Sequence, residues 1–575
     1  MTANNEQKLL PGASKTIRPE ASTSNGDREY SSTMVALTIM ASSITAMFLV
    51  SLDRTIISNA IPSITDQFHS IDDIGWYGSA YMLTNCAFQL IYGRIYKFYS
   101  TQKVFLVAIG LFEIGSAVCG AAPNSTALII GRAVAGAGSA GVLAGVMQIL
   151  VHVVPLEKRP VYTGVLSNMS GIASVVSPIL AGAFTQQVSW RWCFYINLPF
   201  AAVSIVIVFL LVKTPPPQED GLPITEQLLQ LDIHGLFLFI PCVVCLILAL
   251  QWGGSTYSWN DGRIIGLWVV FGLTLVAWLA VQAWKKENAT VPGRIFFQRS
   301  ILSSFLFSVS FVPSMVLLVY YIPIWFQAIK GDSPVEAGLS FLPFILGLMT
   351  AATLGGLVTQ RIGYYVPTMI GACVVSGVGT GLLTNLFKPD TAHSTWIGLQ
   401  VLCGFGVGLG IQQPILAAQT VLPPPDISTG IAIIFFGQQL GGTIFLQVAE
   451  TVFSHSLKNG LENLPGLGPE KADAIAIAGA TEFRTMVSSS LLSEVLKVYN
   501  RAIAHTWYIS LSLSCVAIIP VLFMEWRTIK AKRSGAKRVS DANQLRGTSE
   551  TADTNSQQAT PTKEENISSK GTEDV

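Results

Sequence analysis

Asp53 and Arg54 lie side by side near the end of an apolar stretch that begins at about Met34. A charged side chain at the centre of a bilayer costs about 2.5–3.5 kcal/mol on insertion scales, so such residues persist where they face protein or water. Neighbours on a helix point about 100° apart, and these two side chains therefore need separate partners. Asp53 is a candidate for proton exchange, because the charge of a carboxyl responds to nearby water and cations. A fixed structural ion pair is the alternative.

Arg132 is a second charge within an apolar segment, residues 126–150. An Arg side chain keeps its charge in any environment. Arg132 could therefore bind a carboxylate in one conformation and release it in another, while Gly136 and Gly138 let a neighbouring helix pack closely. The alternative is that Arg132 extends to the nearby membrane surface, since its segment begins only a few residues earlier.

Two glutamates are further candidate protonation sites. Glu113 lies in the middle of the apolar segment 103–122, and Glu450 lies near the end of the segment 428–453. A carboxyl within a spanning segment is rare and commonly belongs to a proton or substrate path. For Glu113, a neutral and hydrogen-bonded carboxyl that serves helix packing is the interpretation that we favour.

Polar and aromatic side chains in apolar segments are candidates for a site that binds organic cargo. Tyr81, Asn85 and Gln89 are spaced by four residues, which places them on one face of a helix. Small-molecule sites combine apolar walls with a few amide or hydroxyl groups. Further candidates of the same kinds are Tyr320, Tyr321, Trp325, Gln327, Gln412, Gln413, Gln438 and Gln439. Hydrogen bonding between helices explains a polar stripe equally well.

Composition indicates a polytopic, all-α membrane protein. Half of the 575 residues are hydrophobic and 12% are charged, against about 25% charged in an average soluble domain. The net charge of +1 offers no basic face for nucleic acid. A span needs about 20 apolar residues. We expect fourteen transmembrane helices, at 35–60, 74–95, 103–122, 126–150, 160–185, 192–212, 232–251, 263–284, 301–327, 337–359, 366–387, 394–420, 428–453 and 506–525.

Lys and Arg in the short loops predict the orientation, because they favour the cytoplasmic side. The loops on the side of the termini hold most of them, including Lys97, Lys158 and Arg361. Both termini are therefore predicted to be cytoplasmic, as disordered tails at 1–33 and 526–575. Residues 454–505 become a long extracellular loop. Asn124 starts a glycosylation sequon in an outer loop, very close to the next span.

Weak internal repetition divides the chain into two related halves. Thr163, Gly164 and Gly171 recur with the same spacing as Thr429, Gly430 and Gly437. Many secondary transporters are built from such repeats. We therefore expect one six-helix bundle at 34–212, two inserted helices with their linkers at 213–300, and a second six-helix bundle at 301–525.

Several stretches resemble a known family. They are LDRTIISNAIP (52–62), ALIIGRAVAGAGSAG (127–141), VPLEKRPVYTG (154–164) and SWRWCFYINLP (189–199). Together they are similar to the major facilitator superfamily, specifically its fourteen-span drug:proton antiporters, and most of all to fungal toxin and multidrug efflux pumps. The resemblance covers about residues 35–525. It implies the major facilitator fold and proton-coupled transport, and it strengthens the proton-exchange interpretation of Asp53.

The loops after spans 2 and 10 depart from the motif of this superfamily, which has the form GxLxDRxGR. Gly93 matches the first copy, but Lys97 replaces the acidic residue. The second copy keeps three matching residues, Gly356, Arg361 and Gly363, while Gln360 replaces its acidic residue. The acidic gate contact that the resemblance implies is therefore missing from both loops.

The motif of span 5 also differs. The family pattern GxxxGPxxG corresponds to ASVVSPILAG (173–182), in which Ala173 and Ser177 stand where glycines are expected. Pro178 remains, and Gly182 lies one position after the last glycine of the pattern. Small residues still permit another helix to approach closely.

Motifs that are missing from the sequence narrow the function. No GxxxxGK[ST] phosphate loop is present, so ATP is not expected to drive the protein directly. The six His residues are isolated, and no hydrolase motif appears, so we expect no enzyme, no cofactor and no metal site.

We expect a monomeric secondary transporter in the plasma membrane, with the vacuolar membrane as the alternative. Its predicted partners are protons, the lipid bilayer and a small molecule. It would export a hydrophobic or amphipathic secondary metabolite, mycotoxin or drug by alternating access. The alternatives are a proton-coupled importer of a nutrient, siderophore or polyamine and, less favoured, a membrane sensor that transports nothing. A short polar tail argues against the sensor.

Overall fold

The computed structural model describes residues 33–68, 73–212, 232–254, 257–465, 467–468, 470–472, 475, 483–487 and 489–530. Residues 31–531 form one compact unit. Its described secondary structure is helical apart from two isolated β-bridges. Thirteen described helical segments are long and apolar enough to cross a membrane. The helix α2 (Ile74–Phe98) is not among them although it has 25 residues, because polar side chains lower its mean hydropathy. The all-α polytopic fold is confirmed.

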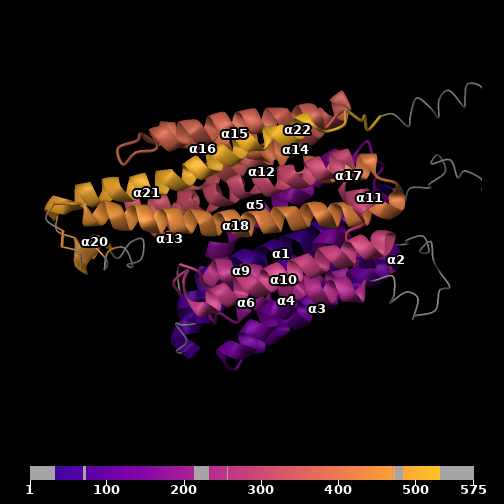
Figure 1. Cartoon of the computed structure of the whole chain (residues 1–575), viewed down its shortest axis with the longest axis horizontal. Helices are drawn as coiled ribbons and strands as arrows, with labels where there is room; N and C mark the ends of the chain where they lie inside the picture. Colours follow the sequence, from indigo (N-terminus) through magenta and orange to yellow (C-terminus); the bar gives the residue numbers. More distant parts are fainter. Residues whose placement is uncertain are drawn as a thin grey trace, which may run out of the picture. The chain divides into compact units, whose positions relative to one another are not determined.

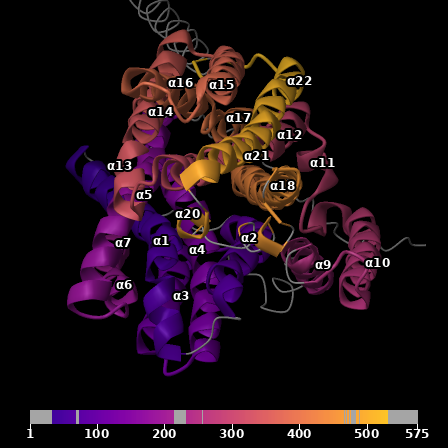
Figure 2. The same cartoon turned by 90° about the vertical axis from the view of Figure 1, so that its left-hand side faces the viewer.

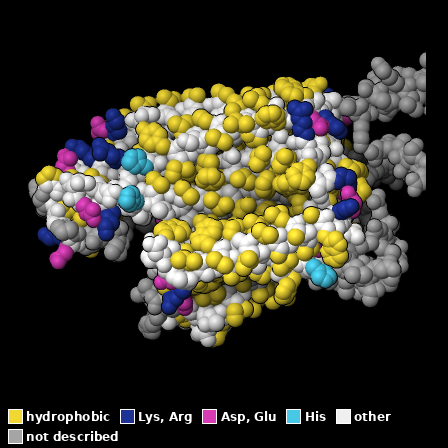
Figure 3. Space-filling model, viewed as in Figure 1, with side chains coloured by type: hydrophobic (Ala, Val, Ile, Leu, Met, Phe, Trp, Pro, Cys, Tyr) yellow, Lys and Arg dark blue, Asp and Glu magenta, His cyan; other side chains and the backbone are white. Residues whose placement is uncertain are grey.

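Apolar side chains cover most of the face seen in Figure 3, and charged side chains gather toward its two ends. Within the unit the long helices run side by side (Figure 1). This distribution fits a bilayer, in which an exposed apolar band faces lipid and charged groups reach water.

The first half of the chain forms one bundle. Its helices are α1 (Thr33–Phe68), α2, α3 (Thr101–Ala121), α4 (Ser125–Val153), α5 (Arg159–Gln187), α6 (Trp192–Tyr195) and α7 (Asn197–Leu211). Glycines let α4 lie close to both α2 and α3. A Cβ on Gly136 would lie 2.3 Å from the carbonyl oxygen of Tyr81, and one on Gly138 would lie 2.3 Å from the backbone nitrogen of Phe112. Both predicted packing roles are confirmed.

Two inserted helices follow, α9 (Ile233–Trp252) and α10 (Gly262–Lys285), and then η2 (Lys286–Asn288) and α11 (Gly293–Phe296). Figure 2 shows α9 and α10 at one edge of the unit, with α9 on the inner side. α9 contacts α2 and α18 (Ile427–Glu462), while most side chains of α10 are exposed. This exposure fits a helix that faces lipid.

Asp232 joins the two inserted helices where α9 begins. Its buried carboxylate accepts hydrogen bonds from Gln282 near the end of α10 (3.0 Å) and from the backbone nitrogen of Thr290 (2.7 Å), and it pairs with Lys285 (3.1 Å). Burial alone would raise the pKa of Asp232, but hydrogen bonds from Thr290, Gln282 and Lys285 outweigh burial and lower that pKa below its usual value. The predicted span begins at residue 232, and the observed helix α9 begins one residue later, at Ile233.

The second half forms the other bundle. Its helices are α12 (Arg299–Trp325), η3 (Phe326–Lys330), α13 (Pro334–Ser340), α14 (Leu342–Ile362), α15 (Val366–Leu386), α16 (His393–Gly410), α17 (Gln413–Val421), η4 (Pro424–Asp426), α18, α20 (Phe483–Met486), α21 (Ser489–Val516) and α22 (Ile518–Leu522). Buried serines join three of these helices: the hydroxyl of Ser314 lies 2.6 Å from that of Ser514 and 2.8 Å from that of Ser510, and Ser514 also lies 3.2 Å from Ser376.

The two halves meet along α2 with α18 and along α5 with α14. Glycine brings the backbones together in both pairs. A Cβ on Gly93 would lie 2.4 Å from the Cβ of Ala432, and a Cβ on Gly356 would lie 2.5 Å from the carbonyl oxygen of Pro160. Gly164 meets Ala352 in the same way. All three contacts lie toward the end of the unit where α2 and α14 end and α5 and α18 begin, which we call the junction end.

The described parts of residues 454–505, predicted as a loop, are largely helical. α18 continues to Glu462 and α21 begins at Ser489. The extensions are held by apolar contact, with Leu457 and Leu461 buried, and by a 2.8 Å hydrogen bond between Ser456 and His505. Polar residues interrupt the hydropathy of these turns, so a hydropathy window does not find these parts of the two helices.

The predicted tail 526–575 also begins too early. Ile529 is buried, and its backbone nitrogen donates a 2.9 Å hydrogen bond to the carbonyl oxygen of Gly363. The remainder of this tail, from residue 531, and the predicted tail 1–33 up to residue 32 lie outside the described residues.

Candidate functional site

Asp53 and Arg132 form a buried ion pair between α1 and α4. Arg132 Nη1 lies 2.6 Å from Asp53 Oδ2, and the side chains are 1% and 0% exposed. Arg132 Nε also donates a 3.0 Å hydrogen bond to the carbonyl oxygen of Tyr77 on α2. Arg132 therefore does not extend to the surface, which answers the alternative that the sequence left open. Removing either partner would leave a buried charge uncompensated.

The ion pair is enclosed by polar and aromatic groups from three other helices. Asn197 on α7 lies 3.4 Å from Asp53 Oδ1 and 3.4 Å from the hydroxyl of Ser116 on α3. The guanidinium carbon of Arg132 lies 4.4 Å from the ring centroid of Tyr81. Sequence reasoning missed Asn197 and Ser116, because a single Asn or Ser in an apolar segment gives no signal of its partner.

Glu113 lies on α3, one turn before Ser116, and is buried. Neither of its carboxyl oxygens has a hydrogen-bond partner among the described residues. The predicted hydrogen bond that would hold a neutral carboxyl is therefore missing from the described part of the chain. Since an ionised carboxylate without a partner is costly to bury, this surrounding favours the neutral form. Glu113 also lies within electrostatic range of Asp53.

Arg54 points away from this cluster. Its side chain is exposed, although it lies within the apolar segment of α1, near its end. It lies within electrostatic range of Tyr81 on α2. The described residues include no hydrogen-bond or ion-pair partner for its guanidinium. Asp53 and Arg54 thus have separate surroundings, as their spacing predicts.

Asn85 and Gln89, two residues of the predicted stripe on α2, have different surroundings. Asn85 donates a 2.6 Å hydrogen bond to Ser139 on α4 and accepts a 2.7 Å hydrogen bond from Gln439 on α18, so it joins the two halves. Gln89 is completely buried, and neither end of its amide has a partner among the described residues. At Asn85, the interpretation as a hydrogen bond between helices is therefore confirmed.

The other candidate cargo residues lie in several places. Trp325 is buried in the second bundle, where its indole nitrogen donates a 2.6 Å hydrogen bond to Asn500. Tyr321 is buried beside Phe453, with ring centroids 5.7 Å apart. Both therefore serve packing in this conformation. Gln413 is buried. Tyr320 and Glu450 are exposed and lie within electrostatic range of each other. The half-buried candidates are Gln327, Gln412, Gln438 and Gln439.

A cluster of ion pairs closes the junction end. Lys97 on α2 lies 3.1 Å from Asp426, which directly precedes α18, and Arg294 on α11 lies 2.8 Å from the same carboxylate. Arg294 also lies 3.3 Å from Glu287. We call Lys97, Asp426, Arg294 and Glu287 the junction cluster. The residue that departs from the family motif, Lys97, thus contacts an acid in the opposite half.

The second copy of the loop motif lies at the same end. Arg361 is exposed, and Gly363 ends α14 with a φ of +88°, a left-handed conformation that favours glycine. Lys530 donates a hydrogen bond to the carbonyl oxygen of Arg361. No ion pair of Arg361 with the first half occurs among the described residues. The two motif copies are therefore used differently.

The span-5 motif is only partly used for packing. Ala173 and Ser177 are buried, and Pro178 lies inside α5. A Cβ on Gly182 would meet nothing within 4 Å, so this glycine permits no close approach in this conformation. The tight contact of α5 lies at Gly164 instead.

Asn124 is exposed and caps α4: its side-chain oxygen accepts a 2.9 Å hydrogen bond from the backbone nitrogen of Ala127. The middle residue of the sequon, Ser125, is buried and accepts a 2.9 Å hydrogen bond from Tyr77. The sequon is therefore part of a helix start.

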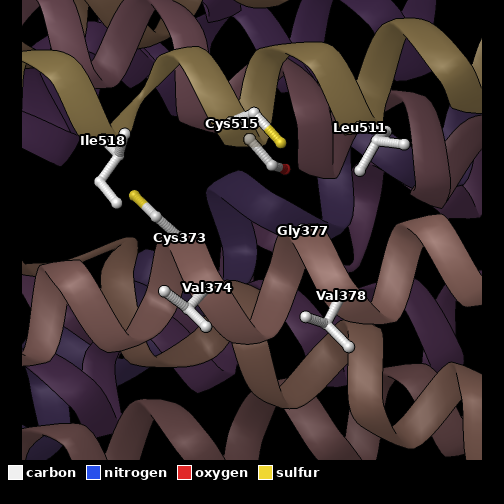
Figure 4. A pocket seen from close by; sticks show the side chains of 8 residues that line it. Cys373, Val374, Gly377, Val378, Leu511, Cys515 and Ile518 are labelled. Carbon is white, nitrogen blue, oxygen red and sulfur yellow. The ribbon is translucent and has the colours of Figure 1, made fainter.

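Two other kinds of site were considered. No group of three or more His, Cys, Asp and Glu side chains that could hold a metal occurs within the part of the chain that the structure describes. An apolar groove lies between α15 and the helices α21 and α22 (Figure 4), and it contains no carboxylate or cation. Its lining residues are Cys373, Val374, Gly377, Val378, Leu511, Ser514, Cys515 and Ile518.

Comparison with known proteins agrees with this architecture. Residues 44–446 match the Major Facilitator Superfamily. The chain is 48% identical over 490 residues to the MFS-type efflux pump MFS1 of Arthroderma benhamiae, covering 85% of this chain and 91% of the relative. It is 47% identical over 498 residues to the efflux pump aflT of Aspergillus parasiticus, covering 86% and 96%. The chain belongs to the major facilitator superfamily.

Solved structures show the same fold at low identity. The human organic anion transporter MFSD10 has a TM-score of 0.54 and 13% identity, covering 83% of this chain and 99% of that one. The proton:xylose symporter XylE has a TM-score of 0.53 and 14% identity, covering 87% and 99%. The family match and the relatives at 47–48% identity show that the protein is a multi-pass membrane transporter and not an enzyme.

Proposed function

We propose that this chain exports a hydrophobic or amphipathic small molecule in exchange for protons, by alternating access. The observation that carries the proposal is the buried Asp53–Arg132 ion pair, 2.6 Å long, between two spanning helices. The relatives named efflux pumps supply the direction of transport. Each pH unit supplies about 1.4 kcal/mol per proton.

Proton exchange at Asp53 would work through its partner. In the described conformation Arg132 pairs with the side chain of Asp53. When the helices move and Arg132 separates from it, a carboxyl in a dry surrounding favours its protonated form. Protonation and the orientation of the halves are then linked states, so proton entry can drive cargo export. Glu113, unpaired and near Asp53, is a second place where a proton can reside.

The junction end is the cytoplasmic side in this proposal, following the distribution of Lys and Arg in the loops. Contacts at Gly93, Gly164 and Gly356 and the junction cluster close that end. The described conformation is then the one open toward the outside. The plasma membrane is the proposed location, with the vacuolar membrane as the alternative, and a monomer is the proposed working form.

Proteoliposomes test the proposal. The purified chain would be reconstituted, and uptake of anthraquinone and of anthraquinone-2-carboxylic acid would be followed under an imposed pH difference. We expect accumulation against a concentration gradient only when the pH difference is present. Asp53→Asn keeps a side chain of similar shape and is expected to abolish this accumulation. Flux that ignores the pH difference, or full accumulation by Asp53→Asn, would overturn the proposal.

A further inference from the structure

We propose that Arg54 is an anion-binding site on the cargo path, and that the cargo carries a carboxylate or a similarly delocalised oxygen anion. The inference rests on the proposed function, since it names the chemical class of the exported molecule. It is argued from the position of Arg54, its accessibility and the charges around it.

The position of Arg54 places it between the helices that face the second half. α1 contacts both α2 and α5, and these are the helices that meet α18 and α14. Arg54 lies within electrostatic range of Tyr81 on α2. Ser51, one turn earlier on α1, lies 3.0 Å from the hydroxyl of Ser170 on α5. The side chain of Arg54 therefore lies on the face of α1 between α2 and α5, which is directed at the second half and not at lipid.

The accessibility of this face changes along α1. Arg54 and Ser170 are exposed. Met47 lies seven residues before Arg54, on the same face of the helix, and is only 7% exposed. Toward the junction end this face is closed at Met47, whereas Arg54 and the neighbouring Ser170 are accessible. A molecule that reaches this accessible patch can contact Arg54.

No acidic side chain among the described residues pairs with Arg54. The helices α2, α4, α5, α6 and α7, which pack against α1, contain no Asp or Glu. α1 contains two acidic residues. Asp53 pairs with Arg132, and Asp66 lies about 18 Å from Arg54 along the helix axis. On α3, Glu113 is buried behind the Asp53 cluster. Across the interface, α12 and α14 contain no acidic residue, and Glu450 of α18 lies near Tyr320.

The charge and the planar donors of an unpaired guanidinium favour an anionic ligand. Arg presents a planar set of donors that matches a carboxylate in two parallel hydrogen bonds. A neutral cargo leaves the charge of Arg54 unpaired, whereas an anion neutralises it. Arg132 cannot play this role in the described conformation, because Asp53 and the carbonyl oxygen of Tyr77 already occupy it.

Binding of a matched pair of probes tests the inference. Anthraquinone-2-carboxylic acid and its methyl ester would be titrated against the full chain in lipid nanodiscs without a pH difference, with quenching of tryptophan fluorescence as the readout. We expect the wild type to bind the acid at least ten times more tightly than the ester. Arg54→Gln is expected to bind both equally, and Arg54→Lys to keep part of the preference.

Controls make each outcome decisive. Arg501→Gln removes an exposed Arg of α21 and is expected to keep the preference for the acid. Thermal unfolding of every variant shows whether the fold is kept, and Arg54→Lys remains informative if Arg54→Gln fails to fold. Equal affinities in the wild type, no binding of the acid, or an unchanged preference in Arg54→Gln would each overturn the inference. If the preference for the acid fails but neutral anthraquinone still accumulates under a pH difference, the proposed function stands without this inference. If the preference for the acid is intact but transport no longer depends on the pH difference, only the proposed function is contradicted.

Discussion

Asp53 and Arg54 differ by one position and have opposite surroundings. Asp53 is completely buried against Arg132, while Arg54 is exposed and has no partner among the described residues. The 3.6-residue period of the helix accounts for this difference, because neighbours point about 100° apart. In the functions that we propose, one short motif therefore supplies both an acid for proton exchange and a cation for cargo.

The buried ion pair leads to a prediction about stability. Removing one partner of a buried ion pair typically costs about 3–5 kcal/mol, while removing both costs less because no charge is left unpaired. We expect Arg132→Gln to lower the unfolding temperature strongly, and the double variant Asp53→Asn with Arg132→Gln to recover part of the loss. Thermal unfolding in detergent, followed by size-exclusion chromatography, measures both. A double variant less stable than Arg132→Gln alone contradicts this prediction.

A second prediction at this scale concerns Glu113. Gln has nearly the shape of a neutral carboxyl, so Glu113→Gln is expected to keep the unfolding temperature within a few degrees of the wild type. Glu113→Lys places a fixed charge in the same buried position and is expected to fail to fold or to unfold at a much lower temperature. If Glu113→Gln is as destabilising as Arg132→Gln, the carboxyl is not neutral in this conformation.

The sequence identified single charges better than their partners. Asp53, Arg132 and Glu113 are visible because charges are rare in apolar segments, and no spacing rule joins Asp53 to Arg132, 79 positions apart. Trp325 and Tyr321 show the opposite failure: aromatic residues line binding sites and fill cores alike, and here both fill the core of the second bundle. Only the arrangement of helices separates these cases.

At the scale of helices, the junction cluster predicts a charge-reversal experiment. Lys97→Asp places a carboxylate beside Asp426 and is expected to separate α2 from α18. Asp426→Lys places an ammonium group beside Lys97 and is expected to separate the same two helices. The combination of both substitutions restores opposite charges at this pair and is expected to recover closure. Reactivity of a cysteine introduced at Ala432, which packs on Gly93, toward a water-soluble maleimide reports the opening.

The outcome of that experiment is decided by the double variant. Recovery to the low reactivity of the wild type supports direct pairing across the halves. Equal reactivity in the single and double variants means that the pair contributes little, as many exposed ion pairs do. Arg294 also pairs with Asp426, so Asp426→Lys and the double variant remove that second ion pair as well.

The attachment of the inserted helices predicts a pH dependence. The pKa of Asp232 is lowered in the folded chain, so its stabilising effect is complete above the ordinary value of about 3.9 and is lost as the pH falls through the lower folded value. We expect Asp232→Asn to reduce the unfolding temperature at pH 7. The difference between wild type and variant is expected to shrink below about pH 4. A difference that stays constant from pH 7 to pH 3.5 contradicts this assignment.

Element positions were largely predictable, and element ends were not. Each predicted span coincides with helical structure, because long apolar runs are a strong signal. The extensions of α18 to Glu462 and of α21 from Ser489 were missed, since these turns are stabilised by each other and not by lipid. Asp426 and Arg294 gave no signal either, because their pairing depends on how the halves meet.

At the scale of the whole molecule, close backbone contact predicts how the two halves can be held apart. A Cβ on Gly356 would lie 2.5 Å from the carbonyl oxygen of Pro160 in the opposite half. Gly356→Val is therefore expected to disfavour the conformation that is closed at the junction end. Gly371→Val on α15 is the matched control, because a Cβ there meets nothing within 4 Å.

Proteolysis and transport together measure that effect. We expect Gly356→Val to expose protease sites at the junction end and to reduce proton-driven accumulation at least tenfold, while Gly371→Val behaves as the wild type. Wild-type transport by Gly356→Val would mean that this contact is not needed in the cycle.

The linker after the two extra helices supplies Arg294 to the carboxylate of Asp426, and Asp232 ties that linker back to α9 and α10. Excising the two extra helices together with their linkers would therefore remove the positive charge of Arg294 from the contact between the two remaining halves. A minimal twelve-helix derivative cannot be obtained by trimming alone; it would need a compensating replacement of Asp426 from the outset.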